Sequence, residues 1–181
     1  LLGEFVLGMF IGTIARTLMT ALDTAGMFMS MQIGLANAQI FNPAFATQGS
    51  IMGAFMSITG AVLLFATNLH HVLFTAIIDS YRSFPPGMMD ADFSGDLAEM
   101  VSKTVTQAFA IGFHMAMPFI IVTTMIYVAM GILSRLMPQL QVFVLSMPLQ
   151  IMLGLITFIL CGSAAMLYWL AHYETGISYF S

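Results

Sequence analysis

The stretch GLANAQIFNPAFATQG, residues 34–49, is rich in small residues and amides, is bounded by glycines and contains a proline. It lies inside residues 24–78, a run without any Asp, Glu, Lys or Arg that is far longer than the roughly 20 residues needed by one membrane-spanning helix. Asn42-Pro43 disfavours helix and removes a backbone donor. Non-helical backbone at membrane depth survives only where protein or a water-filled cavity surrounds it. We therefore expect an irregular loop enclosed by an assembly, acting as the closure of a conduit.

The composition around this loop is that of an integral membrane protein. Hydrophobic residues make up 60% of the chain and charged residues only 7%, with a mean hydropathy of +0.97, whereas soluble domains carry about 25% charged residues. Four basic residues are too few for the clusters of a nucleic-acid surface, so we expect no nucleic acid as a partner. The single cysteine, Cys161, excludes a disulfide framework and is expected to be a small buried residue.

Residues 1–33 are predicted to form a helix with one polar stripe. Thr13, Arg16, Thr20 and Asp23 recur at helical spacing, and Glu4 falls on the opposite face. A charge at membrane depth costs about 2.5–3.5 kcal/mol, so it faces a partner or water. Two interpretations stay open: contacts between subunits, or the border of a conduit. The GxxxG pattern of residues 8–12 allows a close approach of another helix.

Three further helices are expected. The first covers residues 50–83, with Gly53 and Gly60 as packing positions, and ends at the FPPG of residues 84–87. The second starts at an N-cap at Asp96, after an acidic loop, with a Glu99–Lys103 pair in its first turns and a kink at Pro118.

The chain then turns back on itself. Two prolines ten residues apart predict a hairpin whose tip holds Arg135 and Pro138. The last helix is expected over residues 148–173. Its aromatic residues are typical of a belt at the membrane interface: Tyr168, Trp169 and Tyr173, with Tyr179 just beyond.

No catalytic motif stands out, so we expect a protein that is not an enzyme and has no cofactor. The four histidines lie on three separate segments without a cluster at metal-ligand spacing, and His70 and His71 are interpreted as hydrogen-bonding or interface residues. The eighteen methionines are flexible and polarisable. They are interpreted as core or lipid-facing residues, or as a deformable seal near the loop.

Residues 134–149, SRLMPQLQVFVLSMPL, resemble the FliR family of flagellar export gate subunits, which is related to the SctT subunits of virulence type III secretion. That family carries an Arg-x-x-Pro-Gln turn followed by a Phe and a Pro-Leu pair. Glu4 with the two glycines at 8 and 12, the loop to Pro43, and Asn68 and His70 ahead of the PPG turn resemble the family in the same order. The resemblance covers essentially the whole chain, and a full member has a further N-terminal hydrophobic region.

The resemblance implies a single all-α, membrane-associated domain over residues 1–181, made of kinked hydrophobic helical hairpins resembling fused FliP-like and FliQ-like parts. It implies a place in the flagellar basal body at the bacterial inner membrane, in contact with lipid. The partners implied are FliP-like and FliQ-like subunits, FlhA, FlhB and the unfolded proteins that are exported.

The family's corresponding loop plugs the conduit, and here the plug residues are Gly34, Asn37, Ile40, Phe41, Asn42 and Pro43, with Ile40 and Phe41 as apolar stoppers. The residues expected at assembly contacts or along the conduit are Glu4, Arg16, Asp23, Arg135, Pro138, Gln139 and Pro148.

The chain departs from the family pattern at several positions. Asn42 stands where an Asp is common, Gln150 where a Lys is common, Leu69 where a Gly is common and Gln141 where an Asn is common. Two alternatives to an export gate subunit remain. In a small-molecule transporter the loop would be an unwound substrate site, which predicts an inverted repeat and a coupling carboxylate at Glu4 or Asp23. In a structural scaffold the loop would only pack.

Overall fold

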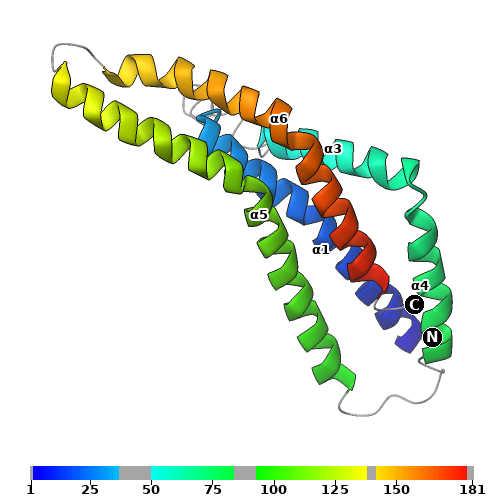
Figure 1. Cartoon of the computed structure of the whole chain (residues 1–181). Coiled ribbons are helices and arrows are strands. Elements are labelled where there is room, and N and C mark those ends of the chain that lie inside the picture. Colours follow the sequence, from blue (N-terminus) through cyan, green and yellow to red (C-terminus); the bar gives the residue numbers. More distant parts are fainter. Residues whose placement is uncertain (1, 37–49, 84–92, 138–141, 179–181) are drawn as a thin grey trace.

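The computed structural model describes residues 2–36, 50–83, 93–137 and 142–178, and these ranges form helices and no strand. The helices are, in chain order, α1 (Leu2–Ile33), α3 (Ile51–Ala66), α4 (His70–Ser83), α5 (Phe93–Leu136) and α6 (Val142–Ser178) (Figure 1). The all-α class is therefore confirmed, and α1 ends where the sequence predicts. The likeness to fused FliP-like and FliQ-like parts stays a prediction.

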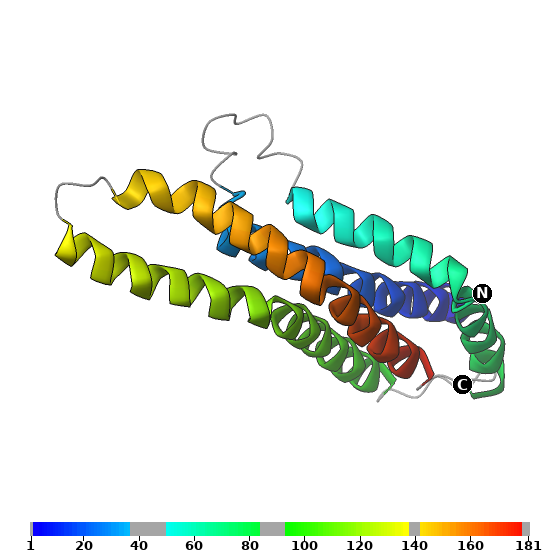
Figure 2. The same ribbon diagram turned by 45° about the horizontal axis from the view of Figure 1, so that its top comes forward.

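Helix α1 is the element around which the others pack, because it contacts α3, α4, α5 and α6. One face of α1 is buried along most of its length, and this face repeats at the helical period. Its central residues are Ile14, Leu18, Ala21, Leu22, Ala25 and Met29. Figures 1 and 2 show α5 and α6 as a long antiparallel hairpin that lies against α1 and extends beyond it. The turn of this hairpin falls in the predicted region.

The helix expected over residues 50–83 is broken, which corrects the prediction. Helix α3 ends at Ala66 and α4 begins at His70, with a bend of 71° between them. Asn68 has φ 59°, in the left-handed region that Asn tolerates better than most residues. The break was not predicted because apolar residues continue on both sides of it.

Helix α5 begins at Phe93, three residues before the N-cap expected at Asp96. The Glu99–Lys103 ion pair is confirmed, with 2.8 Å between Oε1 and Nζ. Figures 1 and 2 show α5 changing direction in its middle, and Pro118 lies inside this helix. Proline lacks the N–H that would bond to the carbonyl four residues earlier, which weakens the helix locally.

Helix α6 starts at Val142 and encloses Pro148, which was expected to begin it. The prediction of an aromatic belt at the membrane interface is wrong for two of its residues, because Trp169 and Tyr173 are each only 1% exposed. Trp169 Nε1 donates a hydrogen bond to the Leu18 carbonyl of α1 at 3.0 Å. These two rings hold α6 on α1 and do not mark a membrane interface, and Tyr179 lies outside the described residues.

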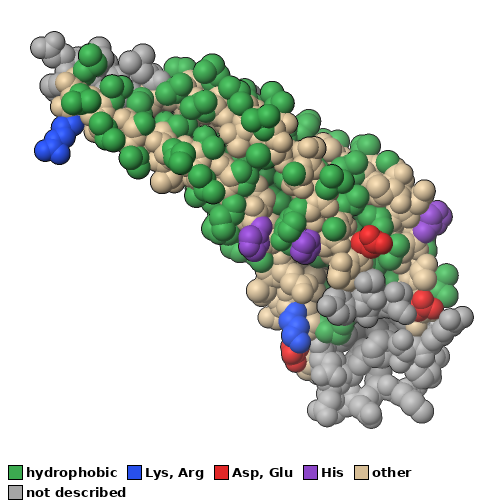
Figure 3. Space-filling view, in the orientation of Figure 1, with side chains coloured by type: hydrophobic (Ala, Val, Ile, Leu, Met, Phe, Trp, Pro, Cys, Tyr) green, Lys and Arg blue, Asp and Glu red, His purple; other side chains and the backbone are tan. Residues whose placement is uncertain are grey.

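Among the described residues, two helical segments are long and apolar enough to cross a membrane, Ala98–Leu136 and Ser146–Ile177, and the bent pair α3–α4 gives a third if it counts as one span. Large apolar side chains are exposed on the outer half of the α5–α6 hairpin, including Met125 (69%) and Ile159 (78%). Figure 3 shows hydrophobic side chains covering this end of the molecule. Cys161 is half-buried, less enclosed than expected.

Candidate functional site: the anchored ends of segment 37–49 and the polar face of α1

The end of α1 is set by Gly34, the first of the predicted plug residues. Its φ of 84° lies in the left-handed region, where a side chain would be strained. The Gly34 N–H donates to the Met31 carbonyl at 3.3 Å, and the Ala36 N–H donates to the Ser30 carbonyl at 3.3 Å. This is a glycine C-cap, so the chain leaves the helix in a defined direction.

Two other helices bind the last turn of α1. The Gln32 carbonyl accepts a hydrogen bond from Thr123 Oγ1 of α5 at 3.0 Å and another from Gln150 Nε2 of α6. Gln150 Nε2 also lies 3.4 Å from the Tyr127 hydroxyl. The last carbonyls of a helix have no partner within it, so these bonds satisfy a group that burial would otherwise leave unpaired. Thr123 and Gln150 are both buried.

Close backbone approach strengthens the same contact. A Cβ added to Gly154 of α6 would meet Ile33 Cγ1 at 2.5 Å, so only glycine lets α6 lie this near the end of α1. The roles of Thr123, Gln150 and Gly154 at this point were not predicted. The available signal was a hydroxyl and an amide inside apolar helices, where a polar group needs a partner.

The other end of segment 37–49 is also anchored to α1. Ser50 caps α3, because its Oγ accepts from the Gly53 N–H at 3.2 Å, and the same Oγ donates to the Gly26 carbonyl at 3.0 Å. A Cβ on Gly26 would lie 2.3 Å from the Cα of Gly53. The expected packing role of Gly53 is confirmed, as is that of Gly60, whose added Cβ would meet Leu22 at 2.1 Å.

Segment 37–49 therefore connects two fixed points, the cap at Gly34 and the cap at Ser50. Five predicted plug residues lie in this segment, outside the described residues: Asn37, Ile40, Phe41, Asn42 and Pro43. Their role as a plug stays a prediction. The described residues show that both ends of the segment are held by helix packing.

The polar stripe of α1 faces outward, as its spacing predicts, with Thr13, Arg16, Thr20 and Asp23 exposed. The threonine hydroxyls donate to carbonyls of their own helix, for example Thr13 to Met9 at 2.7 Å. Asp23 Oδ1 accepts from Ser57 Oγ of α3. Within the described part of the chain Arg16 has no ion-pair partner, so its charge faces the surroundings of this chain.

The remaining predicted assembly residues lie apart from this stripe. Arg135 is exposed in the last turn of α5, and Pro148 is exposed within α6. Figure 1 shows that this end of the hairpin lies far from the N-terminal part of α1. Glu4 belongs to α1, but its side chain is not described, and Pro138 and Gln139 fall outside the described residues. The structure thus brings Asp23 near α3 and leaves Arg135 distant.

Elsewhere the described residues contain no group of three or more His, Cys, Asp or Glu side chains that could hold a metal ion. His70 and His71 stack on each other, with ring centroids 4.2 Å apart, and His70 also lies against Phe65. These contacts fit packing at the α3–α4 bend.

Residues 1–176 match the family described as "Bacterial export proteins, family 1". The flagellar biosynthetic protein FliR of Caulobacter vibrioides is 35% identical over 178 residues, which are 98% of this chain and 70% of that protein. FliR of Bacillus subtilis is 29% identical, with 88% of this chain and 62% of that protein aligned. Yop proteins translocation protein T of Yersinia pestis is 29% identical over 81% of this chain and 56% of its own length. The chain thus spans between about half and 70% of the length of these relatives.

Proposed function

The chain belongs to family 1 of the bacterial export proteins, and from this premise we propose that it is a subunit of a flagellar type III protein export gate. In this role it forms part of a protein-conducting channel and is needed for the export of flagellar proteins. The observation that carries the proposal is the match over nearly the whole chain to proteins named for flagellar biosynthesis and for Yop translocation.

Within that role, segment 37–49 closes the conduit. Its two ends are fixed by the Gly34 and Ser50 caps, so a change in the segment does not require α1 or α3 to move. The apolar residues Ile40 and Phe41 are the proposed stoppers, flanked by small residues and by Asn37, Asn42 and Pro43. The fixed ends support this proposal because a plug must return to the same position after each passage.

The polar face of α1 is the proposed contact with neighbouring gate subunits, through Arg16 and Asp23, and Glu4 supplies a further contact from the opposite face of the same helix. The hairpin end supplies a second contact through Arg135, Pro138, Gln139 and Pro148. The partners are FliP-like and FliQ-like subunits, with FlhA and FlhB beyond them, in the inner membrane at the flagellar basal body. An exposed arginine in a chain with so few charges supports a protein partner, because exposure of its charge to lipid would be costly.

The plug is tested by replacing residues 37–48 with glycine and serine, which keeps the chain length and both caps. We expect the gate to assemble and the resting membrane to leak small solutes, measured as growth inhibition by a normally excluded dye. The same replacement in residues 84–92 is the matched control and should not cause leakage. A tight membrane in the 37–48 variant would refute the plug while leaving the gate assignment intact.

The gate assignment itself is tested by purification from the native membrane. We expect the chain to be isolated together with several FliP-like and FliQ-like chains. A self-sufficient monomer or homodimer with no such partners would contradict the assignment and favour a transporter or a scaffold.

A further inference from the structure

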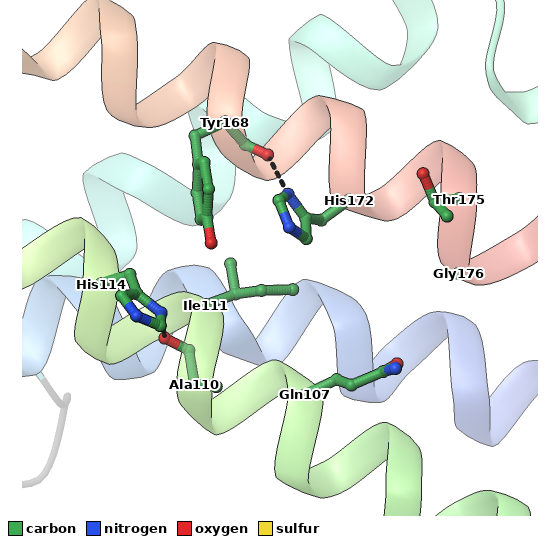
Figure 4. A pocket seen from close by; sticks show the side chains of 8 residues that line it. All are labelled: Gln107, Ala110, Ile111, His114, Tyr168, His172, Thr175 and Gly176. Carbon is green, nitrogen blue, oxygen red and sulfur yellow. Dashed lines mark hydrogen bonds between the residues drawn. The ribbon is translucent and has the colours of Figure 1, made fainter.

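A notch of about 300 Å³ lies between α5 and α6, away from the ends of segment 37–49. Gln107 and His114 line it from α5, and Tyr168, His172 and Thr175 line it from α6 (Figure 4). Figure 4 shows the two imidazole rings on opposite walls, with the phenol of Tyr168 between them. The residues that line this notch include no carboxylate, so it is suited to an anionic ligand.

The backbone fixes both imidazoles in the same way. His114 Nδ1 lies 2.8 Å from the Ala110 carbonyl, and His172 Nδ1 lies 2.9 Å from the Tyr168 carbonyl. A carbonyl can only accept, so each Nδ1 carries its proton and each Nε2 remains for a ligand. When the ring gains a second proton, Nε2 becomes a charged donor. Neither ring can turn its Nδ1 to a ligand without losing a hydrogen bond.

The notch lies where exposed polar side chains give way to apolar surface on both helices. On α5 the exposed residues ahead of His114 mix polar with apolar side chains: Ser102, Lys103, Thr106 and Gln107 with Val105, Phe109 and Phe113. Those after it are largely apolar: Met117, Ile121, Met125, Val128 and Ile132. On α6 the order is reversed. Exposed apolar residues from Met152 to Leu167 precede Tyr168, and His172, Glu174 and Thr175 follow it. The two transitions meet at the notch.

The length of the apolar part matches a bilayer. Residues 115–136 span about 33 Å as a helix, close to the roughly 30 Å of a hydrocarbon core. The notch therefore lies at the level of lipid headgroups when the apolar hairpin is embedded. Figure 3 shows histidine side chains at the edge of the hydrophobic surface, which fits this level.

A second, apolar groove continues along the same pair of helices. It has a volume of about 330 Å³ and is lined by Val122, Met125 and Ile126 of α5 and by Leu149 and Leu153 of α6. Met125 follows His114 by three helical turns, so it lies on the same face of α5 and about 16 Å deeper. That depth is about half of a hydrocarbon core, which an acyl chain covers.

From the notch, its position at the level of the lipid headgroups and the apolar groove, we propose that this chain binds a phospholipid. Its headgroup phosphate occupies the notch, and an acyl chain follows the α5–α6 contact to the apolar groove. The phosphate oxygens accept hydrogen bonds from the Tyr168 hydroxyl, the Gln107 amide and Nε2 of each protonated imidazole.

The residues that line the notch include no Lys, Arg, Asp or Glu. The charged groups near it are few. Glu99 and Lys103 of α5 pair with each other, and Glu174 of α6 is exposed beyond His172. Helix α1 packs on both helices but supplies none of the lining residues. Recognition of a phosphate in the notch is therefore assigned to Gln107, His114, Tyr168 and His172.

The proposal is tested on the full chain in detergent by native mass spectrometry with added dioleoylphosphatidylglycerol. The H114F/H172F double variant should bind this lipid about tenfold more weakly than the unchanged chain, as expected for the loss of charged hydrogen bonds. The His71→Phe variant is the matched control, since it removes an exposed histidine of α4, and it should bind as the unchanged chain does. Circular dichroism checks that all variants stay folded.

Two further probes test the identity of the ligand. Dioleoylglycerol, which has the same acyl chains without phosphate, should bind weakly, and inorganic phosphate at equal concentration should not displace the lipid. Equal binding of dioleoylglycerol would refute recognition of phosphate, and displacement by inorganic phosphate would refute the lipid as its source. Unchanged binding by the double variant would refute the site.

A photo-crosslinking residue at position 172 tests the assembled complex in the membrane. We expect it to capture phospholipid. Capture of another protein chain instead would show that a partner covers the notch, and would overturn the proposal. All these measurements are independent of protein export, so they stand or fall separately from the proposed gate and plug.

Discussion

The two halves of α1 use glycine in opposite ways. Near its end, Gly26 is in such close contact with α3 that an added Cβ would lie 2.3 Å from the Gly53 Cα. Near its start, Gly8 and Gly12 are exposed, and an added Cβ at either would meet nothing within 4 Å. The GxxxG pattern of residues 8–12 thus permits close approach, but none of the described helices lies against it. The isolated Gly26, without such a pattern, makes the contact.

This difference separates two tasks along one helix. The packed half holds the two ends of segment 37–49 through the Gly34 and Ser50 caps and the bonds to the Gln32 carbonyl. The open half presents Arg16 and a row of threonines whose hydroxyls are already bonded to their own helix. Stability of the chain should therefore depend on the packed, C-terminal half of α1, and association with other chains on the open, N-terminal half.

The largest loss of stability is expected at Gly26, where the neighbouring helix lies nearest. Gly26→Leu places a side chain into the backbone of α3, which cannot yield as a flexible side chain would. We expect a loss of about 3 kcal/mol or more, at the upper end of overpacking costs, measured as a lowered melting temperature in detergent. Gly8→Leu is the control and should leave the melting temperature unchanged. Equal melting temperatures for the two variants would contradict the assigned packing.

A smaller loss of stability is expected when the donors to the Gln32 carbonyl are removed. Thr123→Val or Gln150→Leu leaves this carbonyl one of its two donors, whereas the double variant removes both. The double variant should lose about 1–3 kcal/mol, the cost of an unsatisfied buried group, and more than the sum of the single losses. Thr124→Val is the control, because the Thr124 hydroxyl is exposed and bonds only within its own helix. Strictly additive single losses in thermal unfolding would argue against the shared carbonyl.

The smallest effect on stability is expected at the open half. Arg16→Gln removes a charge that has no ion-pair partner in the described residues, so the free energy of unfolding of the isolated chain should change by less than about 0.5 kcal/mol. The same variant should reduce co-purification with FliP-like and FliQ-like chains if the polar face is an assembly contact. Arg16→Lys should restore part of it. A destabilised chain with unchanged co-purification would reverse the two roles.

Local sequence signals account for much of the fold. The glycine at 34 and the charge-free run predicted the end of α1, and the prolines at 138 and 148 predicted the hairpin between α5 and α6. The spacing of Arg16 and Asp23 predicted an exposed stripe. Each of these features depends on neighbours in the sequence, such as a missing backbone donor, a left-handed φ or a helical period.

Two of the misses concern contacts that are distant in the sequence. Trp169 could equally mark a membrane interface or fill a core, and only the Leu18 carbonyl, 151 positions away, decides for the core. The sequence drew attention to Gln150 only because a Lys is common at this position in the family. Its hydrogen-bond partner is the Gln32 carbonyl, 118 positions away. The break between α3 and α4 was also not predicted, because apolar residues flank it on both sides and the helical pattern continues across it.

The sequence by itself determined that the chain is apolar and helical, where α1 ends, and that an irregular segment interrupts the charge-free run. The tertiary structure decided which glycines receive a neighbouring helix, that the two ends of segment 37–49 are anchored to α1, α5 and α6, and that two histidines meet across a notch. The physical reason is that helix formation and termination depend on local backbone chemistry. Helix pairing depends instead on side chains far apart in the sequence that fit together only once the helices have packed.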